Sequence, residues 1–124
     1  MKNKKIMIVD DDAEIRESMV QALMMEDYSV ITAVNGRNAL DLLGSYDAAN
    51  LPNCIIVDLT MPVMGGEQFL SEIKSSSSSH LSRIPIIIAS AKGYGQLEIP
   101  GANGMLAKPL DLSDLYSVVE SYCE

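Results

Sequence analysis

The stretch Cys54–Gly66, CIIVDLTMPVMGG, decides how the rest of this chain is arranged. A run of β-branched apolar residues, Ile55–Val57, precedes Asp58, and a loop rich in proline and glycine follows. A short apolar run bounded by turn residues predicts a fully buried β-strand. Such a strand places Asp58 at the carboxyl edge of a sheet, where open α/β folds build their ligand sites. The alternative for this stretch alone is that Asp58 caps the next helix or belongs to a turn.

Short apolar segments of the same kind recur along the chain. We expect further strands at Lys5–Val9, Tyr28–Val34, Ile84–Ala89 and Gly104–Ala107. Between them the hydrophobic period becomes helical, which predicts helices from Ala13 to about Glu26, at Asn38–Tyr46, at Glu67–Lys74 and after Asp111. Alternating strands and helices predict an α/β fold, a parallel sheet with helices on both faces. Right-handed crossovers make this five-stranded sheet doubly wound.

Several local expectations accompany these elements. Asp12 and Asp111 are placed to cap helices, and Asn35-Gly36 is a turn signal. The serine run Ser75–Ser79 indicates a surface connection, with His80 as a solvated side chain beside it. In the last helix, helical spacing predicts an inward face made of Leu112, Leu115, Val119 and Tyr122.

The bulk composition limits the possible functions. With 124 residues the chain has the size of one domain, and we expect residues 1–124 to form it. The net charge of −8 argues against direct binding to nucleic acid or to an anionic membrane, because both favour a basic surface. No apolar stretch approaches the roughly 20 residues of a membrane span, and the start does not have the form of a signal peptide. Cys54 and Cys123 do not suggest a disulfide framework, so free thiols and a cytoplasmic location are expected.

Unusual polar residues recur at the ends of the predicted strands. They are Asp10 and Asp11 after the first strand, Asp58 at the end of the third, Ser90 after the fourth and Lys108 at the end of the fifth. Parallel strands end at one edge of a sheet, so these side chains are expected to converge there. Each alone has a structural alternative, such as a helix cap or a turn, and only the complete set is specific.

This set of residues suits a divalent cation and a phosphoryl group. Close carboxylates repel one another and raise each other's pKa, and a hard cation such as Mg²⁺ relieves that repulsion. Asp58 is then available as a carboxylate nucleophile that forms an aspartyl-phosphate. Lys108 and the cation would neutralise charge on the transferring group, and the Ser90 hydroxyl would donate to a phosphoryl oxygen.

The chain resembles the receiver domains of two-component response regulators over essentially its whole length. The matching segments are IVDDD at Ile8–Asp12, VDLTMPVMGG at Val57–Gly66, IASA at Ile88–Ala91 and LAKPL at Leu106–Leu110. The resemblance implies a flavodoxin-like fold with strand order 2-1-3-4-5. It also implies a sensor histidine kinase or phosphotransfer protein as donor, and a downstream protein or effector domain as target. The family phosphorylates and dephosphorylates itself and does not turn over an external substrate.

The same resemblance assigns roles to individual residues. Asp58 would accept the phosphoryl group, and Ser90 and Lys108 would contact it. Asp11 would bind Mg²⁺ directly and Asp10 through water, with Asp58 and the backbone carbonyl of Thr60 as further ligands.

Some features depart from the family's pattern. Met105 stands three residues before Lys108, where the family often has a switch aromatic. The segment between Ser90 and Lys108 is short and rich in glycine and proline, so we expect a short, irregular or missing fourth helix and an atypical output surface. Thr60 and Lys92 occupy positions that tune the lifetime of the phosphorylated state in the family. Gly93-Tyr94-Gly95 begins like a dinucleotide-binding fingerprint but lacks its third glycine.

Three hypotheses for the function follow. The first is a phosphorylatable receiver that acts as a signalling switch. The second is a docking module of the same fold that binds its partner irrespective of phosphate, which Met105 and the irregular segment after Ser90 would favour. The third is a metal-dependent phosphohydrolase, which ranks last because the loop after Asp58 offers only Leu59 and Thr60 where that chemistry needs a second acid.

Overall fold

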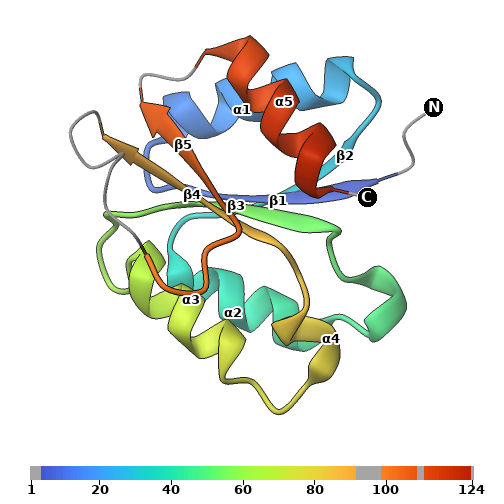
Figure 1. The fold of residues 1–124 in the computed structure, drawn as a ribbon, viewed down its shortest axis with the longest axis vertical. Helices are drawn as coiled ribbons and strands as arrows, with labels where there is room; N and C mark the ends of the chain where they lie inside the picture. Colours follow the sequence, from blue (N-terminus) through green and yellow to red (C-terminus); the bar gives the residue numbers. More distant parts are fainter. Residues whose placement is uncertain (1–3, 92–98, 109–110, 124) are drawn as a thin grey trace.

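The computed structural model describes residues 4–91, 99–108 and 111–123 and shows an all-parallel sheet covered by helices on both faces (Figure 1). Its five strands are β1 (Lys5–Val9), β2 (Ser29–Ala33), β3 (Cys54–Asp58), β4 (Ile86–Ala91) and β5 (Gly104–Lys108). They lie in the order β2-β1-β3-β4-β5. The predicted α/β class and the 2-1-3-4-5 strand order are therefore confirmed.

The helices form one layer on each side of this sheet. Helices α1 (Ala13–Met25) and α5 (Leu112–Tyr122) cover one face. Helices α2 (Gly36–Ser45), α3 (Gly66–Lys74) and the single turn α4 (Ser79–Ser82) cover the other (Figure 1). A 3₁₀ turn, Ala48–Asn50, connects α2 to β3. Among the described residues, no helix has both the length and the apolar character that crossing a membrane requires.

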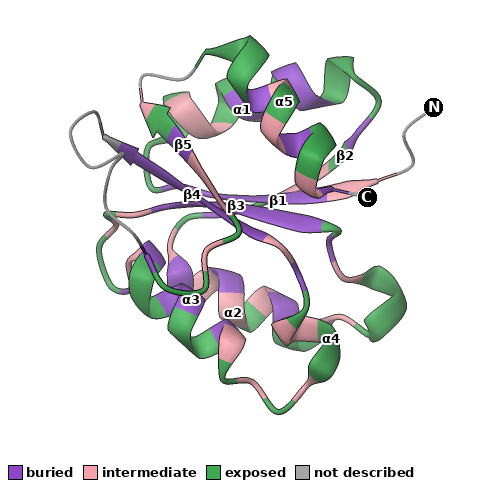
Figure 2. Ribbon diagram, viewed as in Figure 1, coloured by how far each residue is buried: buried purple, intermediate pink, exposed green. Residues whose placement is uncertain are grey.

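The core consists of two clusters separated by the sheet. Side chains alternate between the two faces along each strand, so Ile6 and Ile8 of β1 pack under α1 and α5, while Met7 and Val9 pack against α2 and α3. All five residues of β3 are buried (Figure 2). Both faces of the central strands are covered, which is why their sequences are continuously apolar and do not alternate with polar residues.

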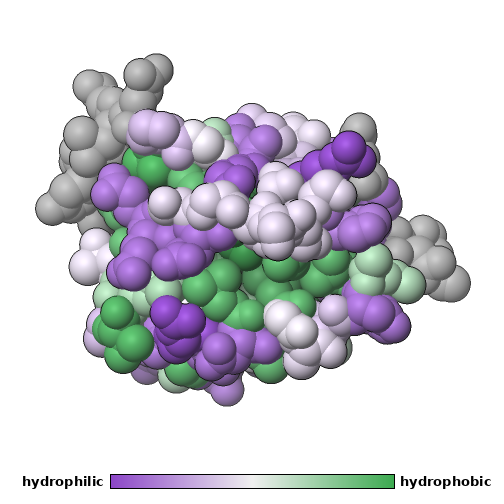
Figure 3. All heavy atoms as spheres, turned by 90° about the horizontal axis from the view of Figure 1, so that it is seen from below, coloured by the Kyte–Doolittle hydropathy of each residue, from purple (hydrophilic) through white to green (hydrophobic). Residues whose placement is uncertain are grey.

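The face formed by α2, α3 and α4 keeps some of its hydrophobic surface in contact with solvent. Figure 3 shows this side, where hydrophobic side chains form a hollowed strip between polar ones. A cavity of about 210 Å³ lies between the end of α2 and α4, and Leu43, Tyr46, Leu51 and Leu81 are among its lining residues.

The helix caps form where the sequence places them. The Asp12 carboxylate accepts the backbone N–H groups of Glu14 and Ile15 at the start of α1. The Asp111 carboxylate does the same for Ser113 at the start of α5. These bonds satisfy N–H groups that have no partner within the helix, and they begin both helices at the carboxyl edge of the sheet.

Of three local expectations, those for Asn35-Gly36 and Leu112 are wrong, and that for His80 is confirmed in its exposure. Asn35-Gly36 is not a separate turn, because Asn35 Oδ1 accepts the Asn38 N–H at 2.8 Å and α2 begins at Gly36. His80 is exposed as expected but belongs to a helical turn, α4, that Ser78 caps. Leu112 is 54% exposed and does not face inward, since it is the first helical residue and no earlier turn lies beneath its side chain.

The segment between β4 and β5 is only partly described. Residues 99–103 contain no helix; the Ala102 N–H donates to the Ile99 carbonyl at 3.1 Å, and Asn103 bonds to Ile86 through its backbone and side chain. Residues 92–98, where the irregular fourth helix was expected, lie outside the described part of the chain, as does Lys92. The short α4 precedes β4, so it does not correspond to that expected helix.

Candidate functional site

The strand register brings the predicted site residues to one edge of the sheet. Asp58 ends β3 and lies beside Ala89 of β4, the residue before Ser90. Ser90 lies beside Ala107 of β5, the residue before Lys108. Asp10 follows Val9, which pairs with Val57. All of these side chains therefore emerge within one or two residues of the same carboxyl edge, as parallel pairing requires.

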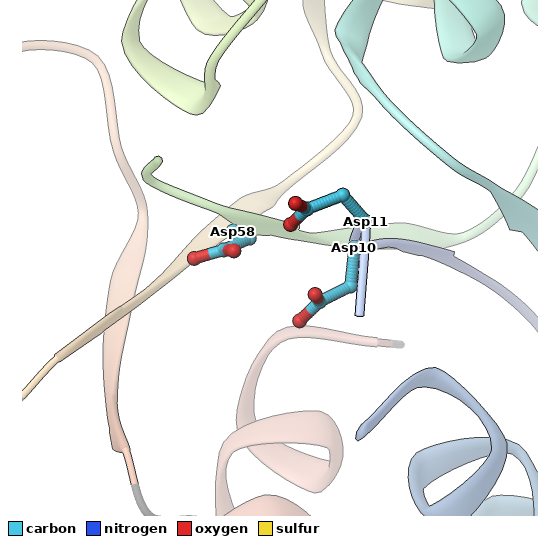
Figure 4. Close-up of side chains that lie close together, drawn as sticks. All are labelled: Asp10, Asp11 and Asp58. Carbon is cyan, nitrogen blue, oxygen red and sulfur yellow. The ribbon is translucent and has the colours of Figure 1, made fainter. Parts of the chain in front are cut away.

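Three carboxyl groups from two strand ends meet at this edge (Figure 4). Asp10, Asp11 and Asp58 each offer one carboxylate oxygen, and these oxygens all lie within 4.8 Å of one another. Asp10 has no solvent exposure and Asp58 is 8% exposed, whereas Asp11 is exposed. The cluster thus has a buried floor and one side open to solvent, through which a ligand could reach Asp58.

Backbone hydrogen bonds fix the position of Asp10. Its Oδ1 accepts the N–H of Asp12 at 2.9 Å, and its own N–H donates to the Ala33 carbonyl at 3.2 Å. The Arg16 guanidinium, from the first turns of α1, donates to the Asp10 carbonyl at 2.7 Å. Arg16 is not among the site residues predicted from the sequence, so this contact was missed. The available signal was its position four residues after the cap Asp12, from which a long side chain reaches back to the strand end.

Lys108 joins two members of the acidic cluster. Its ammonium lies 3.0 Å from Asp10 Oδ2 and 3.2 Å from Asp58 Oδ2. Burial alone would lower the pKa of Lys108, but the hydrogen bonds and charges of Asp10 and Asp58 outweigh it and raise that pKa. Lys108 is therefore a permanent cation at this site.

Asp58 is held in an environment that disfavours its charge. Burial and the negative charge of Asp10 raise the pKa of Asp58, while Lys108 and the backbone amide of Thr60 lower it and only partly compensate. This is the direction expected for Asp58 beside a second carboxylate. A bound cation, or conversion of the carboxylate into an ester, would relieve the repulsion.

Ser90 carries an unsatisfied hydroxyl. Its side chain is 1% exposed, and its Oγ has no hydrogen-bond partner among the described residues. A buried hydroxyl without a partner is unfavourable by about 1–3 kcal/mol, so such a group in a native protein calls for an explanation. At this strand end, a hydrogen-bond acceptor supplied by a ligand would satisfy it.

The donor set fits a hard divalent cation. All three candidate side-chain ligands are carboxylates, and with the Lys108 ammonium they leave an excess of negative charge at the edge of the sheet. Mg²⁺ prefers oxygen ligands of this kind and typically keeps water and phosphoryl oxygens in its remaining positions. Thr60 lies two residues after Asp58 in the adjoining loop, and its role as a carbonyl ligand stays a prediction.

The loop after Asp58 has an unusual backbone. The Met64 N–H donates to the Pro62 carbonyl at 2.7 Å, and Val63 between them has φ of 68°. A γ-turn with positive φ is rare and strained, especially around a β-branched residue. Gly66 closes the loop by donating its N–H to the Leu59 carbonyl at 2.9 Å.

Comparison with known sequences identifies relatives of the whole fold. A family model described as response regulator receiver domain matches residues 6–120. The chain is 31% identical over 115 residues to response regulator MprA of Mycolicibacterium vanbaalenii, covering 90% of this chain and 46% of that protein. It is 31% identical over 122 residues to the regulatory protein AtoC of Escherichia coli, covering 94% of this chain and 24% of that protein. The chain thus spans half or less of the length of these curated relatives.

Solved structures of response regulators superimpose on this chain. A response regulator receiver domain protein of Clostridium thermocellum superimposes with a TM-score of 0.83 at 25% identity, over 97% of this chain and 94% of that one. The chemotaxis response regulator CheY4 of Vibrio cholerae superimposes with a TM-score of 0.80 at 28% identity, over 97% and 98%. Both comparisons extend over nearly the whole chain, including the edge that carries the acidic cluster.

Proposed function

Because this chain belongs to the response regulator receiver domain family, we propose that it accepts a phosphoryl group on the Asp58 carboxylate and acts as a phosphorylation-dependent switch. The observation that carries the proposal is the meeting of Asp10, Asp11, Asp58 and Lys108 at one sheet edge, beside the unpartnered hydroxyl of Ser90. A binding surface without chemistry has no need to hold three carboxylates and an unsatisfied buried hydroxyl together.

Asp58 is the nucleophile in this proposal. A new bond forms between one Asp58 oxygen and the phosphorus of a phosphohistidine, and the P–N bond breaks with its electron pair on the imidazole nitrogen. The raised pKa of Asp58 reflects destabilisation of its ionised form, so converting the carboxylate to an acyl phosphate removes that charge from the buried oxygen.

Lys108 and Ser90 would receive the transferred group. The Lys108 ammonium already lies 3.2 Å from Asp58 Oδ2, where negative charge arrives with the phosphoryl oxygens. The Ser90 hydroxyl would donate to one of those oxygens and so gain the partner it lacks.

Asp10, Asp11, Asp58 and the Thr60 carbonyl would hold Mg²⁺, which neutralises charge on the transferring phosphoryl group when bound. Asp10 and Asp11 would thus be ligands of the metal ion, and the turn between β1 and α1 sets the positions of both. The bond from Asp12 N–H to Asp10 Oδ1 keeps one of these carboxylates oriented before any ligand arrives.

The partners follow from the family. The donor would be a sensor histidine kinase or a phosphotransfer protein, and the target a downstream protein or effector domain. We propose a cytoplasmic location, without direct binding to nucleic acid or membrane, in line with the acidic net charge of −8. Self-phosphorylation and autodephosphorylation would be the only catalysis, without turnover of an external substrate.

Intact mass spectrometry after incubation with acetyl phosphate tests this function. Wild-type protein should gain one phosphoryl group only with Mg²⁺ present, and Asp58→Asn should gain none. Asp12→Asn is a matched control, because asparagine keeps the helix cap while removing a carboxylate beside the site. It should be phosphorylated like wild type, whereas Asp11→Asn should require more Mg²⁺.

A phosphate-independent docking module is the competing function. Met105, half-buried on β5, packs against the core on the α2 and α3 side in place of a switch aromatic. If wild type gains no phosphoryl group and does not bind beryllofluoride, a mimic of the phosphoryl group, the docking module replaces the proposal. Phosphorylation of Asp58→Asn at the wild-type rate would refute Asp58 as acceptor.

A further inference from the structure

Two cysteines far apart in sequence meet at the edge of the sheet opposite to the acidic site. Cys54 is the first residue of β3, and Cys123 is the C-cap of α5. In Figure 1 the C-terminal end of α5 lies over the amino edge of the sheet, where β3 begins. Both are free thiols, 0% and 5% exposed, in the hydrophobic cluster under α1 and α5. Their thiols lie close enough that each shifts the pKa of the other.

We propose that Cys54 and Cys123 form a redox-modification site, in which a hydroperoxide converts the two thiols into an intramolecular disulfide that joins β3 to α5. Thiols already in contact need only a small adjustment to reach disulfide geometry, whereas cysteines directed apart need backbone movement. No other cysteine occurs in the chain, which has 2, so the pairing within one molecule is unique.

The two thiols are not equivalent. The hydrogen bond from Cys54 and the positive charge of Lys4 lower the pKa of Cys123, although burial opposes them. The hydrogen bond with Cys123 and burial both raise the pKa of Cys54. Cys123 is the more exposed of the two thiols, and the positive charge of Lys4 favours its thiolate, so Cys123 is the sulfur that meets the oxidant. Cys54 keeps its proton and is the partner that closes the bond.

The oxidation proceeds in two balanced steps. The Cys123 thiolate attacks one oxygen of hydrogen peroxide, the O–O bond breaks, and the products are a sulfenic acid and, after protonation, water. The Cys54 sulfur then attacks the Cys123 sulfur, the S–O bond breaks, and the hydroxyl leaves as water with the Cys54 proton. Two thiols together lose two electrons, and the peroxide accepts them.

Access to Cys123 requires opening of only one helical turn. The Cys123 N–H donates to the Val119 carbonyl at 2.8 Å, and this bond closes the last turn of α5. Local opening at a helix end has a far smaller free energy than global unfolding. The sheet, including β3 with Cys54 and Asp58 at its two ends, stays intact while the Cys123 thiol meets the oxidant.

The test uses the reduced wild-type protein and hydrogen peroxide under native conditions. Intact mass should fall by two hydrogen atoms, dithiothreitol should reverse the loss, and proteolysis should yield one linked peptide containing both cysteines. Cys54→Ala should instead accumulate a Cys123 sulfenic acid that dimedone traps, because its resolving partner is missing. Cys123→Ala should leave Cys54 reduced under the same treatment.

Other outcomes overturn the proposal. They are a persistent sulfenic or sulfinic acid in wild type, a disulfide between two molecules, or a linked peptide that forms only after unfolding in urea. The wild-type result alone decides between native and non-native pairing, so the conclusion does not depend on whether either alanine variant folds. The proposal is also independent of phosphorylation at Asp58.

Discussion

Two glycine-to-alanine substitutions should change stability in opposite directions. A Cβ at Gly66, at the start of α3, would lie 2.5 Å from the Asp58 carbonyl oxygen and 3.0 Å from Leu59 Cα. Both neighbours are backbone atoms of the loop that carries the proposed phosphoacceptor, so they cannot rotate away. A Cβ at Gly44, in α2, would meet no atom within 4 Å. The same chemical change therefore tests close packing at one position and helix propensity alone at the other.

The expected magnitudes follow from these contacts. At Gly44, alanine gains about 0.5–1 kcal/mol of helix propensity and loses nothing. At Gly66, overpacking against backbone costs about 1–3 kcal/mol, and distortion of the 2.9 Å bond to the Leu59 carbonyl costs about 1 kcal/mol more. After subtraction of the propensity gain, Gly66→Ala should lower the free energy of unfolding by about 1–3 kcal/mol. For a chain of 124 residues, about 1 kcal/mol corresponds to about 4 °C in Tm.

Urea denaturation followed by circular dichroism measures both changes, with metal-free buffer in all samples. Gly66→Ala should shift the midpoint down and Gly44→Ala should shift it up, with unchanged slopes. Beryllofluoride binding adds a readout at the site. Gly66→Ala should weaken it because the Asp58 carbonyl is displaced, and Gly44→Ala should leave it unchanged.

A Gly66→Ala variant that is as stable as wild type and binds beryllofluoride normally would refute close packing at this position. That result would mean that the loop after Asp58 accommodates a Cβ without moving. A destabilised Gly44→Ala would contradict the second half of the argument, because it would show that α2 is not open to solvent at that position.

Three further substitutions test the site and its loop. Asp58→Asn should raise the urea midpoint at pH 7 without metal, because burial and Asp10 raise the pKa of Asp58 and make its ionised form unfavourable. The gain should vanish below pH 3.8, the ordinary pKa of aspartate, where the carboxyl is protonated in folded and unfolded chains alike; a gain that stays constant with pH would contradict this origin. Val63→Asn should stabilise by about 1 kcal/mol, since asparagine tolerates positive φ and the side chain is 78% exposed. The exposed Val34, which is not among the positive-φ residues described, provides the control Val34→Asn, and equal gains in both variants would exclude relief of strain. Ser90→Ala should leave the urea midpoint of the free protein unchanged or raise it, because the substitution removes an unpartnered buried hydroxyl. The same variant should bind beryllofluoride more weakly than wild type. A large loss of stability would show that the hydroxyl already has a partner.

Local sequence patterns were sufficient for the elements of the fold. The buried strand that ends at Asp58 was predicted and is present as Cys54–Asp58, because β-branched apolar runs with turn residues on both sides rarely form anything else. Asp12 and Asp111 were identified as caps for an equally local reason. The prediction was wrong where two local signals competed, as at Asn35, whose side chain caps a helix and does not form a separate turn.

The candidate site was also predictable, since a topological rule connects distant residues. Once the strands are parallel, the residues that follow them share one edge, and Asp10, Asp58 and Lys108 must approach one another. Which of them form ion pairs does not follow from that rule. Lys108 pairs with Ala91, two residues beyond the Ala89 that pairs with Asp58, and the course of its side chain back from that position places the ammonium between Asp10 and Asp58.

The sequence by itself determined the order of the elements, the parallel sheet and the residues at its carboxyl edge, because each follows from hydrophobic period or from strand polarity. Only the tertiary structure decided the contacts between side chains of separate elements. Arg16 reaches the Asp10 carbonyl, and Cys123 meets Cys54, because α1 and α5 pack on the sheet at particular rotations and distances. Those rotations result from the close packing of the whole core, which no local segment of the chain encodes.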